Sequence, residues 1–305
     1  MDPLQIPNLF DVTGCIAVVT GGGSGLGLMM AKALEANGAT VYILGRRKQA
    51  LEAAAKQAKF QRLHPVQCDI TSHDDLTKAV NHITTQSGHI NLLINNAGIA
   101  TPNLGPHATR PTPKWDIAKV RDYWFQKSFG DYAAVLETNT TAMLMVTFAF
   151  LELLHNGNKV RGEQGAQNGA PAANGAAAKR RFFVRSQVIA LSSVGGFGRE
   201  NSAFIYGASK AGTAQMMKNL STYLVPWKIR VNVIVPGYFH TEMTESLHNK
   251  TAGRLPASMT PEERFGDAQE IGGTVVYLAS KAGAYCNGSV LLADGGYLAS
   301  HSSSY

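Results

Sequence analysis

Cysteine is scarce in this 305-residue sequence: Cys15, Cys68 and Cys286 are the three present, and their spacing fits no metal site. An odd number of cysteines argues against a complete set of disulfides, so we expect a reducing compartment and a cytoplasmic location. The sequence also lacks the apolar run of about 18 residues that predicts a membrane span. Its first residues, MDPLQIPNLF, lack the basic start and apolar stretch of a secretory signal. We therefore expect neither a metal nor a membrane.

Charged residues are also few, at 16% of the chain, whereas hydrophobic residues make up 45%. This balance predicts a globular protein with a large core and argues against a disordered chain. The net charge of +7 favours anionic partners. However, basic residues cluster only at 46–48 and 179–181, and no nucleic-acid-binding module is recognisable, so we expect no nucleic-acid partner.

Glycine is abundant after the first apolar run, where residues 20–27 form the motif TGxxxGxG. The pattern predicts a strand at 15–20, a tight turn and a helix at 28–37. Such a turn presents backbone N–H groups and a helix N-terminus to a phosphate. The candidate nucleotide-binding residues of this turn are Thr20, Gly21, Gly23, Ser24, Gly25, Leu26 and Gly27.

A second strand is predicted at 40–44, and NAD-binding proteins commonly carry an acidic residue just after this strand. Here Gly45, Arg46 and Arg47 take that place. Two guanidinium groups can bind a 2′-phosphate, and no carboxylate is there to repel it, so the sequence favours NADPH over NADH. The alternative is that both arginines are solvated residues at the start of a helix.

The stretch from Val188 to Gly212, VIALSSVGGFGRENSAFIYGASKAG, predicts a buried strand, a glycine loop and a helix. Tyr206 and Lys210 are four residues apart, so they share one face of that helix. An ammonium beside a phenol should lower the tyrosine pKa from about 10, which would make Tyr206 a usable general acid. Ser193, at the end of the strand, is placed to hold a carbonyl or hydroxyl oxygen against that phenol.

Further motifs follow short apolar runs: NNAG at 95–98, PG at 236–237 and DGG at 294–296. Each lies where a predicted strand ends, and open α/β sheets bind ligands at that edge. Asp69 also follows a predicted strand, although an N-cap of the next helix would explain it too. Strands that alternate with helices in this way predict one α/β domain built on a parallel, doubly wound sheet.

These motifs, in this order, resemble the short-chain dehydrogenase/reductase family, and the resemblance covers residues 9–298. It implies a single Rossmann-type domain over 1–305, with about seven strands and helices on both faces of the sheet. It also implies a homodimer or homotetramer, assembled through the helices that carry Asn139 and Tyr206.

The resemblance assigns roles to individual residues. Ser193 and Tyr206 would bind the substrate oxygen, and Tyr206 would donate the proton. Lys210 would lower the Tyr206 pKa and hold the nicotinamide ribose, while Asn139 would hold a water in a proton relay; otherwise Asn139 is a buried, satisfied polar residue. Besides the glycine turn, Arg46 and Arg47, the implied cofactor-binding residues are Asp69, Ile70, Asn96, Ala97, Gly98, Tyr206, Lys210, Pro236, Gly237, Phe239, Thr241 and Met243.

The sequence looks most like the 3-oxoacyl-thioester reductase and ketoreductase branch, which implies NADPH-dependent reduction of a ketone to a secondary alcohol. Alternatives on the same site are oxidation of a secondary alcohol and an imine-reducing or non-redox biosynthetic step. A nucleotide-sensing scaffold is a further alternative, although such proteins typically lose the tyrosine or the lysine. Aromatic and methionine side chains near the expected pocket favour an apolar or ring-bearing carbonyl substrate: Trp115, Tyr238, Phe239, Met243 and Met259.

Two segments depart from a minimal family member, and a third matches a position where family members differ from one another. Residues 99–131 begin as a proline-containing loop and continue as an aromatic, basic stretch, which we interpret as either a packed helix or part of the substrate pocket. Residues 155–181 contain almost no large apolar side chains and predict a mobile surface insertion, whose basic end could contact an anionic carrier. Residues 238–266 occupy the position of a substrate lid.

Overall fold

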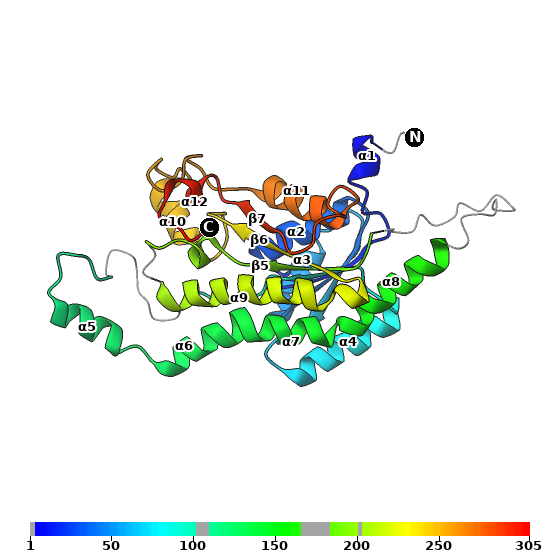
Figure 1. Ribbon diagram of the computed structural model, residues 1–305, viewed down its shortest axis with the longest axis horizontal. Helices are drawn as coiled ribbons and strands as arrows, with labels where there is room; N and C mark the ends of the chain where they lie inside the picture. The colour runs from blue at the N-terminus through cyan, green and yellow to red at the C-terminus, as the bar shows by residue number, and fades with distance from the viewer. Residues whose placement is uncertain (1–3, 102–109, 166–183, 201–202) are drawn as a thin grey trace, which may run out of the picture.

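The computed structural model describes residues 4–101, 110–165, 184–200 and 203–305. One parallel sheet of seven strands organises them, in the order β3-β2-β1-β4-β5-β6-β7. Helices α2, α3 and α11 cover one face of the sheet, and α4, α7 and α9 cover the other (Figure 1). The strands are β1 Ile16–Thr20, β2 Thr40–Gly45, β3 Leu63–Gln67, β4 Leu92–Asn95, β5 Gln187–Leu191, β6 Arg230–Pro236 and β7 Val290–Ala293. The predicted fold class is confirmed.

Helices alternate with these strands, as the sequence predicts. They are α1 Ile6–Leu9, α2 Gly25–Ala36, α3 Lys48–Ala55, α4 His73–Ser87, α5 Ile117–Phe125, α6 Phe129–Leu136, α7 Ala142–Ala149, α8 Leu151–Gly165, α9 Phe204–Tyr223, α10 Glu245–Thr251, α11 Ala268–Ala279 and α12 Tyr297–Ser300. Among the described residues, no single helix is long and apolar enough to cross a bilayer. The pair Phe129–Ala149 and Leu151–Val160, bent by 45°, passes that test only when joined.

The central strands are apolar throughout because both of their faces are buried. In β5, Val188 and Ala190 join the core on one side of the sheet, whereas Ile189 and Leu191 join the core on the other. The strands run in parallel, so their carboxyl ends all meet at one edge. Strand order reverses between β1 and β4, which places a crevice at that point of the edge.

A π-helical turn, η2 (Glu137–Thr141), joins α6 to α7 without breaking the helical path. The helix that the sequence predicts around Asn139 contains this wider turn. Asn139 lies in the turn and is fully buried. Such turns open the i→i−4 hydrogen-bond ladder locally and occur frequently at functional sites. The turn therefore presents Asn139 to the interior, close to the edge at which the strands end.

The prediction of a loop from residue 155 onward is wrong for residues 155–165, which continue α8. Gly157 packs directly on the sheet, and a Cβ atom there would collide with the carbonyl oxygen of Ile90. The Asn158 side chain accepts a hydrogen bond from the Ser186 amide (2.9 Å) and donates one to the Lys228 carbonyl (3.0 Å). These contacts fix this part of the helix to the body, a role that large apolar side chains usually have. The rest of the predicted insertion, residues 166–181, lies outside the described residues.

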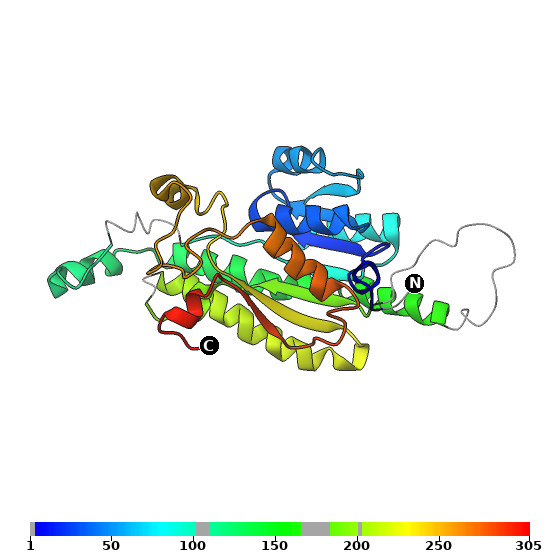
Figure 2. The same cartoon turned by 90° about the horizontal axis from the view of Figure 1, so that it is seen from above.

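Helix α5 forms an arm that projects from the body in both views (Figures 1 and 2). None of its residues is buried. The ring of Trp124 packs at a tilt against Phe204 at the start of α9, with ring centroids 4.9 Å apart, and Tyr123 meets Trp124 edge-on at 5.0 Å. Residues 117–125 thus form a helix, and ring contacts attach it to the body.

Gly157→Ala should lower stability because the added methyl group has no room beside the sheet. We expect a loss of about 1–3 kcal/mol, as for other overpacked sites. Gly273→Ala is the matched control, since Gly273 also lies within a helix and has open space around it. That variant should be neutral or slightly more stable. Urea unfolding followed by circular dichroism measures both, and equal midpoints would contradict the packing described here.

Candidate active site

A cavity of about 620 Å³ opens at the carboxyl edge of the sheet. Most predicted site residues line it. They are Gly21, Gly23, Ser24, Gly25, Leu26, Arg46, Arg47, Asp69, Ile70, Asn96, Ala97, Gly98, Ser193, Tyr206, Lys210, Pro236, Gly237, Phe239, Thr241 and Met243. The other three, Thr20, Gly27 and Asn139, lie behind this lining and support it.

The glycine turn is built around a tight approach of α2 to the ends of β1 and β4. Gly21 and Gly25 have φ of +65° and +52°, conformations that favour glycine. At Gly27 a Cβ atom would collide with the carbonyl oxygen of Gly21 and the side chain of Asn96. Glycine at these positions therefore keeps the backbone of the turn at the cavity surface, as a phosphate site requires.

Thr20 joins the glycine turn to the NNAG motif. Its hydroxyl accepts hydrogen bonds from the amides of Asn96 (3.0 Å) and Ala97 (3.1 Å), and it donates to the Ile94 carbonyl (3.3 Å). The Asn96 side chain in turn donates to the Thr20 carbonyl at 2.9 Å. These two side chains therefore bond mainly to protein, and they fix the ends of β1 and β4 against each other.

Ser193, Tyr206 and Lys210 meet where β5 ends and α9 begins. The Ser193 hydroxyl accepts a hydrogen bond from the Gly195 amide (3.1 Å) and lies in hydrogen-bond contact with Tyr206. The Lys210 ammonium donates to the Leu191 carbonyl (2.9 Å) and lies 6.0 Å from the centroid of the Tyr206 ring. The structure thus brings the predicted triad together in one corner of the cavity.

The predicted direction of the Tyr206 pKa shift is wrong. Burial raises the pKa of this phenol, and the hydrogen bond with Ser193 only partly opposes the rise. Lys210 is itself buried, which lowers the pKa of its ammonium to about 8, and that ammonium is directed at a backbone carbonyl. A raised pKa keeps the Tyr206 phenol protonated at neutral pH, so it remains a proton donor.

Asn139 is saturated by backbone partners and one hydroxyl. Its side-chain amide donates to the Ile99 carbonyl (2.9 Å) and to the Ser209 hydroxyl (3.0 Å), while its oxygen accepts from the Ile99 amide (2.8 Å). Gly98 separates it from Lys210, since a Cβ at Gly98 would lie 3.0 Å from the Asn139 oxygen and 3.4 Å from the Lys210 nitrogen. Asn139 is therefore the buried, satisfied polar residue that the sequence allowed as an alternative, and it lies close to Lys210.

At the other end of the cavity, Asp69 is held by its neighbour Thr71, whose amide (3.0 Å) and hydroxyl (2.7 Å) both donate to its carboxylate. Although burial alone would raise the pKa of Asp69, these hydrogen bonds and the nearby Arg46 lower it overall. The N-cap of α4 is Ser72, whose hydroxyl accepts from the Asp75 amide (3.3 Å), so the capping interpretation of Asp69 is wrong.

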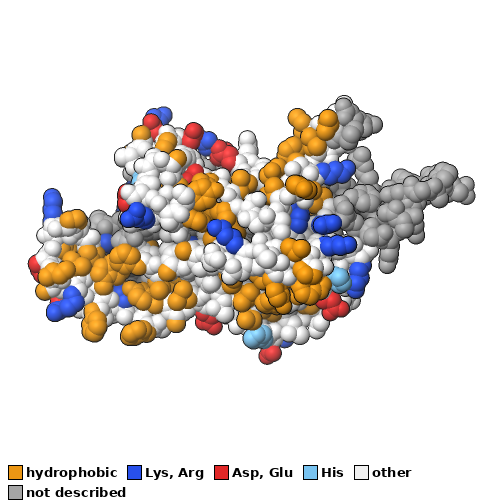
Figure 3. Space-filling model, in the orientation of Figure 1, with side chains coloured by type: hydrophobic (Ala, Val, Ile, Leu, Met, Phe, Trp, Pro, Cys, Tyr) orange, Lys and Arg blue, Asp and Glu red, His pale blue; other side chains and the backbone are white. Residues whose placement is uncertain are grey.

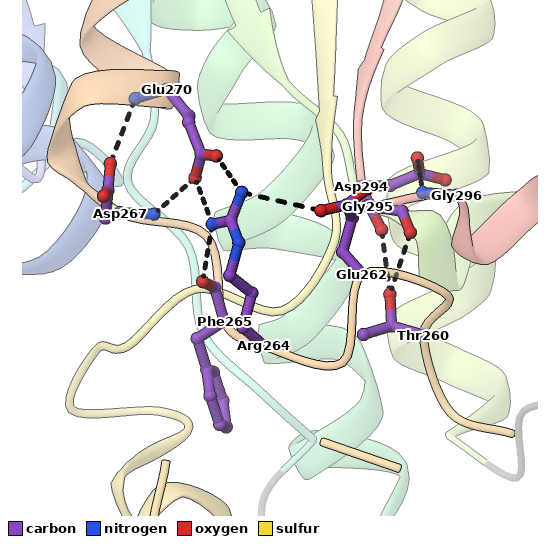
Figure 4. A network of polar contacts seen from close by, with 9 residues as sticks. All are labelled: Thr260, Glu262, Arg264, Phe265, Asp267, Glu270, Asp294, Gly295 and Gly296. Atoms are coloured by element: carbon purple, nitrogen blue, oxygen red, sulfur yellow. Dashed lines mark hydrogen bonds and ion pairs between the residues drawn. The ribbon is translucent and has the colours of Figure 1, made fainter. Parts of the chain in front are cut away.

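The segment 238–266 is anchored at both ends. Near its start, the Thr244 hydroxyl donates to the Phe239 carbonyl (2.5 Å), and Phe239 itself is buried. At its far end, Arg264 forms an ion pair with Glu270, and the Thr260 hydroxyl donates to the carbonyls of residues 294 and 295, both at 3.3 Å (Figure 4). The DGG motif therefore holds the base of this segment as well as ending β7.

Of the side chains predicted to favour an apolar substrate, the cavity includes Phe239 and Met243. Trp115, Tyr238 and Met259 are not part of its lining. Sequence reasoning missed two residues of the site. The Ser209 hydroxyl accepts a hydrogen bond from the Asn139 side chain, and its place directly before Lys210 in the sequence could have indicated a role in the site. Glu242 reaches Arg47 across the cavity, and only its place beside Thr241 pointed to it.

Comparison with known proteins agrees with this geometry. Residues 15–165 match the family described as short chain dehydrogenase, and residues 165–298 match the one described as Enoyl-(Acyl carrier protein) reductase. The chain is 70% identical to the short-chain dehydrogenase/reductase VdtF of Byssochlamys spectabilis, over 99% of this chain and 98% of that protein.

More distant relatives also match most of the chain. The rhamnolipids biosynthesis 3-oxoacyl-[acyl-carrier-protein] reductase of Pseudomonas aeruginosa is 28% identical over 94% of this chain and 98% of that protein. The Pseudomonas aeruginosa RhlG/NADP active-site complex superposes with a TM-score of 0.73 at 26% identity, covering 94% of this chain and 98% of that one. Sequence, site and fold converge, and the chain belongs to the short-chain dehydrogenase/reductase family of oxidoreductases.

Proposed function

We propose that this protein reduces a ketone to a secondary alcohol with NADPH as the hydride donor. The observation that carries the proposal is the shared cavity: the triad Ser193, Tyr206 and Lys210 lies in the same cavity as the glycine turn and the two arginines. The cavity residues fit a nicotinamide dinucleotide, because glycine backbone faces the region for the pyrophosphate and guanidinium groups face the region for the adenosine. When bound, the cofactor supplies the hydride.

The protein's own residues orient the substrate and supply the proton. The Ser193 hydroxyl and the Tyr206 phenol both donate hydrogen bonds to the carbonyl oxygen of the ketone, where negative charge develops. Tyr206 then transfers its proton to that oxygen. Lys210, charged at neutral pH, stabilises the phenolate that remains. The raised pKa of Tyr206 favours the reductive direction, since a protonated phenol is the form required.

The preference for NADPH rests on Arg46 and Arg47 at the end of β2, where no acidic residue follows the strand. A guanidinium binds a phosphate with charge-assisted hydrogen bonds, whereas a 2′-hydroxyl gains less from it. The structural similarity to the Pseudomonas aeruginosa RhlG/NADP active-site complex supports the same cofactor. The substrate class is an apolar or ring-bearing carbonyl compound, in line with Phe239 and Met243 in the cavity.

Homo-oligomer formation through α7 and α9 belongs to the same proposal. Both helices expose large apolar side chains, Phe148 on α7 (42%) and Tyr223 on α9 (59%). Figure 3 shows apolar side chains gathered over α5 and α6 and again over α9. Such surfaces are unusual on a monomer. The proposed location is the cytoplasm, in keeping with three free cysteines.

Tyr206→Phe should reduce turnover of ring-bearing and 3-oxoacyl ketones by at least about 100-fold, because the proton donor is lost. Binding of NADPH should stay within about twofold, since only the hydroxyl is removed. Tyr285→Phe is the control, because it removes the same hydroxyl from a fully exposed residue outside the cavity lining and outside α7 and α9. NADPH oxidation followed by absorbance measures the rates, and a Tyr206→Phe protein with undiminished turnover would refute the assigned donor.

Replacing both Arg46 and Arg47 with alanine should weaken NADPH binding by at least about tenfold and leave NADH binding nearly unchanged. Arg121→Ala, in the projecting α5, removes the same type of charge far from the cavity and should alter neither affinity. Fluorescence titration of the purified variants with each dinucleotide gives the affinities. Equal affinity of the unaltered protein for NADPH and NADH would overturn the proposed preference.

Phe148→Glu should shift the protein from an oligomer toward a monomer, because it places a charge on the proposed interface. Phe60→Glu is the control, since Phe60 is exposed to a similar extent (49%) outside α7 and α9. Light scattering after size-exclusion chromatography gives the masses. A monomeric unaltered protein, or equal masses for the two variants and the unaltered protein, would contradict the proposed interface.

A further inference from the structure

One ion pair crosses the mouth of the cavity. Nη2 of Arg47 lies 3.0 and 3.1 Å from the two carboxylate oxygens of Glu242. The same nitrogen donates to the Ser24 hydroxyl at 3.1 Å. Arg47 follows β2, Glu242 follows β6 and Ser24 belongs to the glycine turn, so three separate parts of the cavity wall meet at one guanidinium.

We propose that Glu242 is a specificity-determining residue, which weakens the discrimination between dinucleotides with a 2′-phosphate and those with a 2′-hydroxyl by competing for Arg47. This inference rests on the proposed function, in which Arg47 binds the 2′-phosphate. NAD-binding proteins commonly carry an acidic residue just after β2, and this chain has none there. In the structure, the segment after β6 brings the carboxylate of Glu242 to that place.

The competition follows from charge. A 2′-phosphate that approaches Arg47 meets a carboxylate already bound to the same nitrogen, so it must displace Glu242 or bind beside it against like-charge repulsion. A 2′-hydroxyl carries no charge and leaves the ion pair in place. Glu242 therefore weakens binding of the phosphorylated cofactor and has little effect on the other.

The size of the effect is limited by solvent. The side chains of Arg47 and Glu242 are 62% and 65% exposed. Exposed ion pairs of this kind change an equilibrium by no more than about fivefold. The ion pair between Arg47 and Glu242 is thus weak enough for a phosphate to displace the carboxylate. It is still strong enough for removal of the carboxylate to change the measured affinity.

Glu242 is not needed to hold the segment 238–266 in place. On either side of it the chain is fixed by other contacts: Thr241 donates its amide hydrogen to Thr244 (3.0 Å), and Arg264 and Thr260 bind the far end to the body (Figure 4). Glu242→Gln should therefore remove a charge without moving the segment.

Glu245 provides a matched control. It lies three residues further along the same segment, and its carboxylate bonds to His240 (2.7 Å) and Asn249 (3.2 Å) and has no contact with Arg47. Glu245→Gln removes the same charge from the same region. A difference between the two variants therefore isolates the contact with Arg47 from the overall change in net charge.

The test uses four full-length variants, Glu242→Gln, Glu245→Gln, Arg47→Gln and the double variant Glu242→Gln with Arg47→Gln. Each is titrated with NADPH and NADH, and then with 2′-phospho-AMP and AMP, which report on the adenosine end alone. We expect Glu242→Gln to tighten binding of both 2′-phosphorylated ligands by about three- to fivefold and to leave binding of NADH and AMP within about twofold. In the double variant this increase in affinity should vanish, because Glu242 competes with the phosphate for the guanidinium of Arg47.

Three results would overturn the inference: no gain with Glu242→Gln, an equal gain with Glu245→Gln, or a gain that persists without Arg47. If the unaltered protein binds NADPH more tightly than NADH and any of these is observed, only the role of Glu242 fails. If the unaltered protein binds neither dinucleotide, the proposed function fails, and the role of Glu242 fails with it.

Discussion

The joint between β1 and β4 is the constraint on which the site depends. At this point the strand order reverses, and the Thr20 hydroxyl bonds both strand ends through the amides of Asn96 and Ala97. Asn96 returns a hydrogen bond to Thr20 and lies against Gly27 of α2. Two motifs 75 residues apart in the chain are therefore one structural unit. These hydrogen bonds hold the glycine turn against the NNAG motif, at the same edge of the sheet as the triad.

The corner of the cavity that holds Ser193, Tyr206 and Lys210 is also fixed by polar side chains that bond to backbone groups. Asn139 binds both polar groups of the Ile99 peptide and the Ser209 hydroxyl, and Lys210 binds the Leu191 carbonyl. These groups lie at the ends of β4 and β5, next to each other in the sheet. Because these polar groups have hydrogen-bond partners within the protein, the orientation of Lys210 and the backbone around Tyr206 are set before a ligand binds.

Much of the fold and the site could be predicted because the informative motifs encode local backbone geometry. A glycine turn between a strand and a helix, or a tyrosine and lysine four residues apart, has the same shape wherever it occurs. The electrostatics could not be predicted in this way: the spacing places Tyr206 and Lys210 on one face but does not reveal how far each is buried, and burial decided both pKa shifts. Residues 155–165 were misjudged for a related reason. Gly157 and Asn158 are held by Ile90, Ser186 and Lys228, which are distant in sequence and invisible to composition.

The π-helical turn at Glu137–Thr141 has a consequence for how this protein can vary in evolution. Residues on its N-terminal side, such as Ala134, face the cavity, whereas Met143 and Val146 on its C-terminal side face the core. Each residue of a helix turns the chain by about 100°, so loss of one residue here would rotate α6 against α7 and withdraw Ala134 from the cavity. Side chains along this stretch can therefore be exchanged more readily than its length can change. Relatives that keep this site should differ here by substitution and place their insertions and deletions elsewhere.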